Sequence, residues 1–219
     1  MNINDFTCAI TEQVTDPAKY PPSYISGTNV PGPLVYPSGA SQTGFFLDNL
    51  TEINNANTFT PGPDGIDDDG NGYIDDTLGW NAYNDTNAIT SRSHGTHVSG
   101  IIGAIGNNGV GVSGVNWGMK IMPIQGSSGL ESTVLKSYGY ALEMRALYDS
   151  TNGAKGAFVV ATNSSFGVDN GDPSSFPLWC AFYDSLGVVG ILNCGATTNQ
   201  GLDVDVEGDL PTACASDFM

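Results

Sequence analysis

The two histidines of the chain are the residues with the clearest chemical potential, because both lie in one heptapeptide, HGTHVSG, as His94 and His97. Imidazole titrates close to neutral pH, so either ring can act as a general base. Zinc binding is the alternative, since histidines three residues apart share one face of a helix. No glutamate stands between them as in HExxH, and no third ligand is evident. The spacing therefore argues against a zinc site.

An acidic segment, PDGIDDDGNGYIDD, precedes the histidines and contains no Lys or Arg. Its oxygen-bearing residues alternate as at the start of an EF-hand-type calcium loop, with Gly72 at the sharp turn. The ligands predicted from this pattern are Asp67, Asp69, Asn71, Tyr73 (through its carbonyl) and Asp75. Leu78 replaces the bidentate glutamate at the twelfth position, so Asp75 or Asp76 must close the coordination shell. We therefore expect calcium as a cofactor, and an ion-free acidic turn is the alternative.

A second acidic cluster lies near the end of the sequence, where carboxylates alternate along the chain at Asp203, Asp205, Glu207 and Asp209. Like charges packed together repel one another unless cations lie between them. The alternation predicts a solvated strand or loop face, and a second cation site is the alternative.

Overall charge limits the partners of the protein. The 219 residues include 23 Asp and Glu but only 6 Lys and Arg, a net charge of −17, while 40% hydrophobic residues suffice for a real core. Such a surface repels phosphate backbones, so nucleic acid and anionic membranes are expected to be poor partners. No apolar run approaches the roughly 20 residues of a membrane-spanning helix, and the start, MNINDFTCAI, lacks the features of a signal peptide.

Four cysteines indicate the redox compartment: Cys8, Cys180, Cys194 and Cys214. No CxxC spacing is present, so a zinc ribbon is not expected. We predict at least one disulfide among the last three, which lie in adjacent segments, and buried free thiols are the alternative. With the low charge and the calcium loop, this predicts a secreted or extracellular protein.

Hydrophobic patterning predicts the elements that position these residues. Residues 1–60 are rich in turn formers and are expected to be irregular. Helices are predicted from near Ser93, over 131–148 and over 176–186, and apolar strands over 119–126, 157–162 and 188–197. Alternating buried strands and helices predict an α/β fold with a mostly parallel, doubly wound sheet that has helices on both faces.

HGTHVSG resembles the histidine signature of the subtilisin-like serine proteases, the subtilases. Similarity continues in the acidic loop GIDDDGNGYIDDTLGWN, in ATNSSFG (161–167), which resembles the family's substrate-binding strand, and in ATTNQGLDVD (196–205), which is similar to its AAGN-x-G segment and precedes PTACAS. The resemblance covers about residues 50–219. It implies that 1–219 form one partial subtilase-like catalytic domain whose C-terminal part is missing.

The resemblance also implies roles for individual residues. His94 would be the general base for a serine nucleophile, and His97 would be structural, packed inside its helix. Ser165, Phe166 and Gly167 would bind an extended protein or peptide substrate and line its main side-chain pocket. Asn199 would donate its side-chain amide to the oxyanion, although Thr197 and Thr198 depart from the family pattern.

The GTSMA-type motif that carries the family's nucleophile is absent from the printed sequence, and Asp48 in GFFLDN is the nearest candidate for the orienting carboxylate. We therefore expect the incomplete core of a secreted, calcium-stabilised subtilisin-like endopeptidase, with the serine on a second chain or segment. The alternatives are a non-catalytic, calcium-stabilised subtilase-like scaffold or binding module, and a calcium-binding adhesion domain.

Overall fold

A five-stranded sheet forms the centre of the molecule. The computed structural model describes residues 6–11, 64–90, 93–108, 111–117, 119–127 and 130–219. Across the sheet the strands follow the order β2 (Trp80–Asn81), β3 (Lys120–Gln125), β1 (Phe6–Thr11), β4 (Val159–Ser164) and β6 (Leu192–Gly195). A separate two-stranded ribbon pairs β5 (Val168–Asp169) with β7 (Asp209–Leu210).

Four of the five central strands run in the same direction. β1 is antiparallel to both β3 and β4, so β3 and β4 are parallel to each other, and β2 and β6 run parallel to these two neighbours. The sheet thus has the predicted parallel pairs and one reversed strand in the middle. The expectation that residues 1–60 are irregular is wrong for Phe6–Thr11, because this segment pairs along its length with β3.

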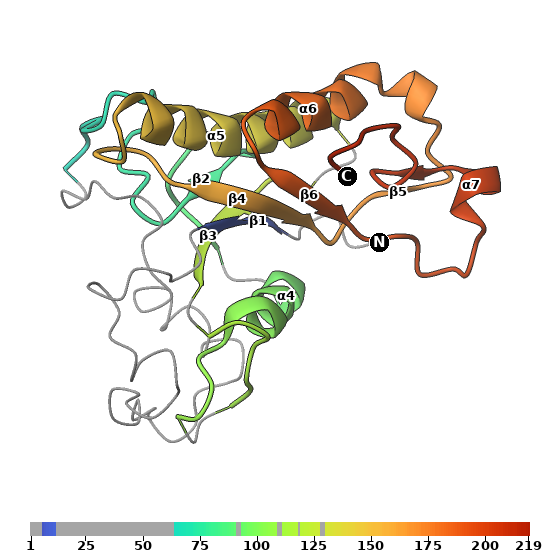
Figure 1. Cartoon of the computed structure of the whole chain (residues 1–219), viewed down its shortest axis with the longest axis horizontal. Coiled ribbons are helices and arrows are strands. Elements are labelled where there is room, and N and C mark those ends of the chain that lie inside the picture. Colours follow the sequence, from blue (N-terminus) through green and yellow to red (C-terminus); the bar gives the residue numbers. More distant parts are fainter. Residues whose placement is uncertain (1–5, 12–63, 91–92, 109–110, 118, 128–129) are drawn as a thin grey trace.

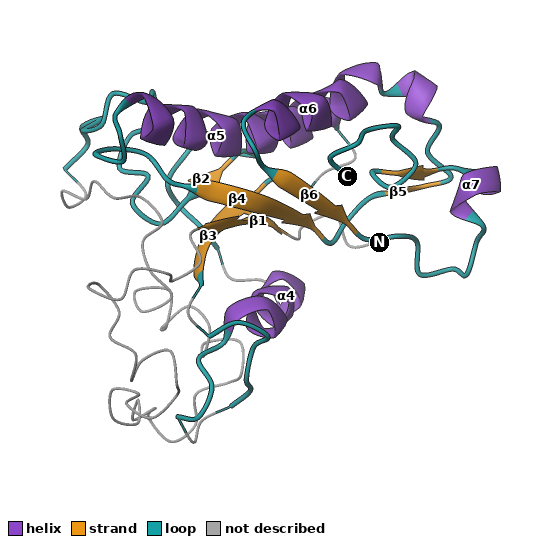
Figure 2. Cartoon of the chain, in the orientation of Figure 1, coloured by secondary structure: helices purple, strands orange, loops and turns teal. Residues whose placement is uncertain are grey.

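The predicted helices are present in the structure. These are α4 (Ser93–Gly103), α5 (Glu131–Ser150) and α6 (Pro177–Val188), with a 3₁₀ turn at Pro173–Ser175 and a short α7 (Val204–Glu207). Figure 1 shows α5 and α6 side by side over one face of the sheet, and α4 on the other side, below β1 and β3. Figure 2 shows the same layers by element type. No helix in the described ranges is long and apolar enough to cross a membrane.

The core lies between the sheet and the α5–α6 layer. Val134, Tyr138 and Ala141 recur at helical spacing along α5 and are fully buried. Trp179 and Tyr183 of α6 are also fully buried. Burying a large apolar side chain stabilises the fold by roughly 1.5–3 kcal/mol, so this interface provides much of the stability of the described part.

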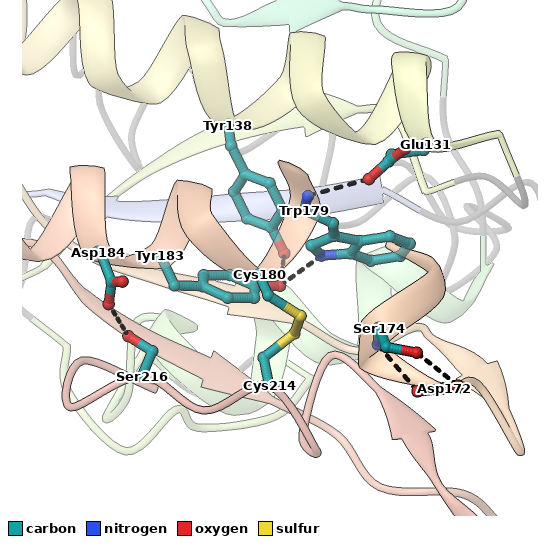
Figure 3. Close-up of a disulfide and its surroundings, with 10 residues drawn as sticks. All are labelled: Glu131, Tyr138, Asp172, Ser174, Trp179, Cys180, Tyr183, Asp184, Cys214 and Ser216. Atoms are coloured by element: carbon teal, nitrogen blue, oxygen red, sulfur yellow. Dashed lines mark hydrogen bonds between the residues drawn. A yellow bond between two sulfur atoms is a disulfide. The ribbon is translucent and has the colours of Figure 1, made fainter. Parts of the chain in front are cut away.

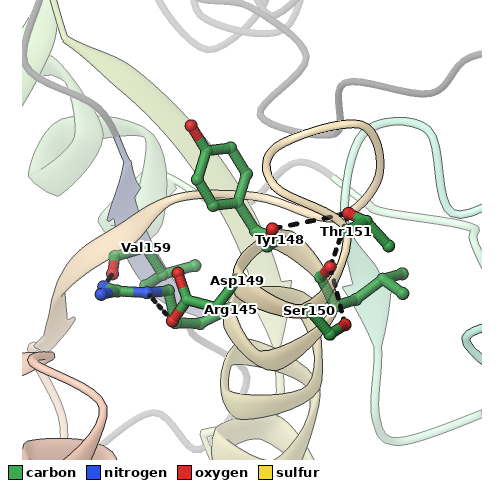
Figure 4. A network of polar contacts seen from close by, with 7 residues as sticks. Arg145, Tyr148, Asp149, Ser150, Thr151 and Val159 are labelled. Carbon is green, nitrogen blue, oxygen red and sulfur yellow. Dashed lines mark hydrogen bonds and ion pairs between the residues drawn. The ribbon is translucent and has the colours of Figure 1, made fainter.

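Polar contacts hold the end of α5 against β4 (Figure 4). Arg145 donates from Nε to Asp149 at 2.8 Å and from its guanidinium to the Val159 carbonyl at 2.7 Å. The same guanidinium lies 4.4 Å from the centre of the Phe158 ring. Thr151 donates to the Leu147 carbonyl at 2.7 Å, which satisfies one of the acceptors left at the helix terminus. The helix is thereby fixed at the start of the strand that leads to residues 165–167.

A disulfide and a hydrogen bond to an amide in its first turn hold α6 in place (Figure 3). Cys180 is bonded to Cys214, 34 residues later, which confirms a disulfide among the last three cysteines. Cys194 is a free, exposed thiol. Glu131 at the start of α5 accepts a hydrogen bond from the Trp179 amide at 3.0 Å, so it caps an amide in the first turn of α6.

Candidate active site

The carboxyl ends of the parallel strands meet at one edge of the sheet. Asn81 pairs with Gln125 across β2 and β3, and Ser164 pairs with Gly195 across β4 and β6. In sheets of this kind, ligands bind where the strands end and the loops diverge. The segments that follow β4 and β6 include 165–167 and Asn199, so the structure brings these two predicted parts of the site to the same edge.

Hydrogen bonds fix the approach to α4 at this same edge. The Gln125 side chain accepts from the Thr90 amide at 2.8 Å and donates to the Thr90 hydroxyl at 2.7 Å. Asn81 donates to Gln125 at 3.2 Å, and both side chains are only 4% exposed. His94 follows Thr90 by four residues, so its Cα lies within roughly 14 Å of this anchor. Its side chain is exposed on the first turn of α4 and is not sealed in the interior.

Small residues face inward along α4. Gly95, Thr96, Ser99, Gly100 and Gly103 are buried, and a Cβ on Gly103 would lie 3.0 Å from the Met119 side chain. The helix therefore approaches its neighbours closely because glycine has no side chain.

His97 does not pack inside the helix layer. Its side chain is exposed, so the expectation that it packs inside α4 is wrong for the described structure. The physical reason is the phase of the helix: the buried face is occupied by the glycines and Ser99, while His94, His97 and Ile101 recur on the opposite face.

Residues 165–167 link β4 to β5. Ser165 is partly buried, and its hydroxyl accepts a hydrogen bond from the Asn163 side-chain nitrogen at 3.0 Å. The Phe166 side chain is 6% exposed and packs 6.0 Å, centroid to centroid, from the Trp179 ring. Phe166 can thus offer its backbone to a substrate, but its ring belongs to the core. A Cβ on Gly167 would lie 1.9 Å from the Leu210 carbonyl oxygen, so only glycine fits here.

A chain of hydrogen bonds lies behind this segment, entirely buried. Ser164 at the end of β4 is 2.6 Å from the Tyr138 hydroxyl, which is 2.7 Å from the Tyr183 hydroxyl. The Trp179 indole donates to Tyr183 at 2.7 Å. Burial raises the pKa of both tyrosines, so the hydroxyls stay protonated. This chain ties the end of β4 to both α5 and α6.

Asn199 lies in an exposed turn after β6. The next residue, Gln200, donates from its side chain to Asp169 at 2.8 Å. This bond connects the turn to β5, which continues directly from 165–167. The two predicted substrate-facing segments are therefore joined by a hydrogen bond as well as by the register of β4 and β6.

The acidic loop folds around its own backbone amides. Asp67 accepts from Gly70, Asn71 and Gly72 at 2.8, 3.1 and 2.8 Å. Asp69 accepts from the Asn71 amide at 3.1 Å. Tyr73 has its ring in the core, 4.8 Å from the ring centres of Trp80 and Tyr140, which leaves its backbone in the loop.

The two aspartates that could close the shell point in different directions. Asp75 accepts from the amides of Asp64 and Gly65 at 2.9 and 3.0 Å, away from the loop centre. Asp76 is 5% exposed and accepts from Tyr140 and from the Asn71 side chain, both at 2.9 Å. Burial raises the pKa of Asp76 to about 6, against the lowering effect of these hydrogen bonds.

The donor atoms of this loop suit calcium in kind, because they are carboxylate, amide and carbonyl oxygens. Asp69, Asn71 and Asp76 converge, since the Asn71 side-chain nitrogen lies 3.2 Å from Asp69 and 2.9 Å from Asp76. Within the described ranges, however, no group of three or more His, Cys, Asp or Glu side chains is placed to hold a metal ion.

The second acidic cluster is only partly solvated. Asp203, Asp205 and Glu207 are exposed around α7, and Asp203 accepts from the Asp205 amide at 3.2 Å. Asp209 is 1% exposed and pairs with Asp169 across the ribbon. The prediction of a solvated face is therefore wrong for Asp209, because β7 carries it inside the protein.

Several of these residues were not predicted from the sequence. Gln125 and Thr90 gave no signal, since their contact joins segments 35 residues apart. Asp169 lies only two residues after Gly167, so its position in the sequence could have marked it as a candidate site residue. Asp48, the candidate for the orienting carboxylate, lies outside the described residues.

Comparison with known proteins supports the family resemblance seen in the sequence. A family model described as the Subtilase family matches residues 12–208. Subtilisin-like protease 1 of Plasmodium berghei (strain Anka) is 51% identical over 75 residues, which are 34% of this chain and 11% of that protein. The Plasmodium falciparum (isolate 3D7) protein of the same name is 52% identical over 62 residues, or 28% and 9%.

A bacterial protein is also similar. Extracellular basic protease of Dichelobacter nodosus is 56% identical over 35 residues, which are 16% of this chain and 6% of that protein. The aligned parts thus span about a tenth or less of the length of these relatives.

Proposed function

The chain belongs to the subtilase family, and from this premise we propose that it is part of the catalytic domain of a secreted subtilisin-like serine endopeptidase. We also propose that the complete domain has a doubly wound, subtilisin-like sheet, to which segments outside this chain contribute. The substrate class is protein or peptide, and the reaction is hydrolysis of a peptide bond.

One observation carries this proposal: residues 165–167, the Asn199 turn and the anchored approach to α4 lie along the same edge of the sheet. A nucleophilic mechanism needs a base, an oxyanion donor and a substrate-binding strand near one another. His94 is exposed on the first turn of α4, where a nucleophile could reach it.

In the proposed mechanism, His94 takes the proton of a serine hydroxyl as that oxygen attacks the substrate carbonyl. It then returns the proton to the leaving amine. The side-chain amide of Asn199 donates a hydrogen bond to the oxyanion that develops on the carbonyl oxygen. The backbone of Ser165, Phe166 and Gly167 aligns the extended substrate, and the buried Ser164–Tyr138 hydrogen bond holds that segment in place.

The nucleophile and the orienting carboxylate complete the proposal. No GTSMA-type serine motif stands in the printed sequence, so we assign the serine to a segment or chain outside these 219 residues. Asp48 remains the proposed candidate for the carboxylate.

Labelling with a fluorophosphonate probe tests this function. The native source protein is treated with the probe, digested and analysed by mass spectrometry. We expect a labelled serine on a segment that copurifies with this chain, and loss of labelling in His94→Ala. Intact native protein without any labelled serine would overturn the proposal.

A second candidate function is a non-catalytic, calcium-stabilised scaffold, binding or adhesion module. Unlabelled native protein that still binds peptides at the 165–167 edge would support this alternative.

We also propose that the acidic loop binds calcium through Asp67, Asp69, Asn71 and the Tyr73 carbonyl. The contacts of Asp76 with Asn71 favour Asp76 over Asp75 as the closing ligand. Bound calcium would neutralise the crowded carboxylates and fix the loop on the sheet.

Calorimetry on EDTA-treated protein tests the calcium site. Calcium should give binding heat and raise the melting temperature, and Asp76→Asn should weaken binding more than Asp75→Asn. Unchanged heat and melting temperature in the unsubstituted protein would remove the site.

A further inference from the structure

The β5–β7 ribbon places two carboxylates opposite each other beside the proposed substrate strand. Asp169 pairs with Asp209 in antiparallel register, and the side chains of directly opposed residues extend from the same face of a ribbon. β5 begins at the residue after Gly167. Asp169 therefore lies two residues beyond the segment proposed to align the substrate, and Asp209 lies across the ribbon from it.

The two carboxylates have only neutral hydrogen-bond donors. Asp209 is 1% exposed and accepts from the Thr212 hydroxyl. One oxygen of Asp169, Oδ2, accepts from Gln200 at 2.8 Å. The other, Oδ1, is buried and has no hydrogen-bond partner. A buried oxygen without a donor is costly, and in a native protein it calls for a missing partner.

Electrostatics favour a cationic partner. Like charges directly opposite each other across two strands destabilise a ribbon. Burial raises the pKa of Asp209, and the neighbouring charge of Asp169 raises it further. A positive charge between the carboxylates would reverse both effects.

Within the described part of the chain, no Lys or Arg supplies this charge. Lys136 pairs with Asp85, Arg145 with Asp149, and Lys155 donates to the Asp69 carbonyl. Lys120 is opposite Thr11, which pairs with Val159 at the start of β4, so it lies at the other end of the sheet from the ribbon. The described residues therefore leave this pair of carboxylates without a cationic partner.

The position of the pair suggests the source of that cation. Gly167 lies against the Leu210 carbonyl on one side, and Gln200 joins Asp169 to the Asn199 turn on the other. Asp169 itself is partly exposed, so solvent reaches the pair at this residue. If the proposed function is right, a peptide bound between 165–167 and Asn199 has its side chain beside this region.

We propose that Asp169 and Asp209 select substrates with a Lys or Arg side chain at the residue bound by 165–167. The inference rests on the proposed function, because it assumes that this edge binds a peptide. The ammonium or guanidinium group donates hydrogen bonds to the unpartnered oxygen of Asp169 and neutralises the pair. Charge-assisted hydrogen bonds of this kind are the stronger ones in proteins.

Peptide binding tests the selection without any need for the nucleophile. Fluorescent tetrapeptides that end in Arg, norleucine or Glu are titrated into the full chain and followed by fluorescence polarisation. We expect the Arg peptide to bind at least about tenfold more tightly than the norleucine peptide, and the Glu peptide to bind most weakly. Equal affinities for Arg and norleucine would overturn the inference.

Three variants locate the effect. Asp169→Asn and Asp209→Asn should each bring the Arg-to-norleucine ratio close to one. Asp205→Asn removes the same charge from an exposed position on α7 and should leave the ratio unchanged. Melting temperatures establish that each variant is folded. A ratio that falls equally in Asp205→Asn would assign the preference to net charge and contradict a specific site.

Three further outcomes separate this inference from its alternatives. If calcium added to EDTA-treated protein binds at Asp169 and Asp209 and abolishes the preference for Arg, the pair is a metal site and the inference fails. If the native protein hydrolyses norleucine and Arg substrates equally well, the inference fails while the proposed function stands. A preference for Arg in binding, with no labelled serine, would support the inference and overturn only the catalytic role.

Discussion

The two sides of the sheet differ in what they bury. On the α5–α6 side, aromatic and aliphatic residues such as Tyr138, Met144 and Trp179 are fully enclosed. On the α4 side, the helix buries glycines and small polar residues, while His94, His97 and Ile101 face outward. The first side holds the fold together, and the second exposes both imidazoles of α4.

The largest expected effect is a loss of catalytic activity when His94 on α4 is replaced, with little change in stability. His94→Ala should lower kcat for peptide hydrolysis by the native protein by about 10²- to 10⁴-fold, because the proposed general base is lost. The melting temperature should stay nearly constant, since the side chain is exposed. Steady-state kinetics with a peptide substrate measures the change.

His97→Ala is the matched control on the same helix face. Because His97 is exposed and is assigned no part in proton transfer, its kcat should remain within about tenfold of the original, well short of the loss at His94. A loss in His97→Ala as large as in His94→Ala would contradict the assignment of the base.

Truncating a buried side chain on α5 and an exposed one on α4 tests the difference in stability between the two sides of the sheet. Met144→Ala on α5 should lower the free energy of unfolding by about 2–5 kcal/mol, because it opens a cavity at a fully buried site. Ile101→Ala on α4 should cost far less, since that side chain is 67% exposed. Urea denaturation of both variants measures the difference, and comparable losses would mean that Ile101 is covered in solution.

The disulfide is a second support of the α5–α6 side. Replacing Cys180 and Cys214 together by Ala should lower the free energy of unfolding by roughly 3–4 kcal/mol, as expected for a crosslink that closes a loop of this length. Cys194→Ala serves as the control, because this exposed thiol makes no disulfide. Thermal unfolding with and without reductant should reproduce the loss only in protein that retains Cys180 and Cys214.

The smallest expected effect concerns Asp209 and depends on pH. Its pKa is raised in the folded state, so the charged form is disfavoured by folding. The cost is absent below the unfolded pKa, grows as the pH rises from there to the raised folded pKa, and is complete above it. Asp209→Asn should therefore raise the melting temperature at pH 8 but not at pH 3, whereas Asp205→Asn should show no such difference.

Much of the fold follows from local sequence. The strands over 120–125 and 192–195 and the helices α4, α5 and α6 lie where apolar runs and helical periodicity predict them. The pairing of Cys180 with Cys214 was one of the options allowed by sequence. Strand β1 was missed, because a six-residue segment among turn-forming residues becomes a strand only through its partners β3 and β4.

By itself, the sequence determined the family, the histidine motif and the oxygen-rich loop, because these depend on residue type and on spacing along a few residues. Only the tertiary structure decided that His97 faces outward, that Phe166 turns its ring into the core, and that Asp76 rather than Asp75 faces Asn71. It also decided that Asp209 is buried opposite Asp169. Burial and pairing of this kind arise from contacts between segments far apart in the chain, which local patterns do not encode.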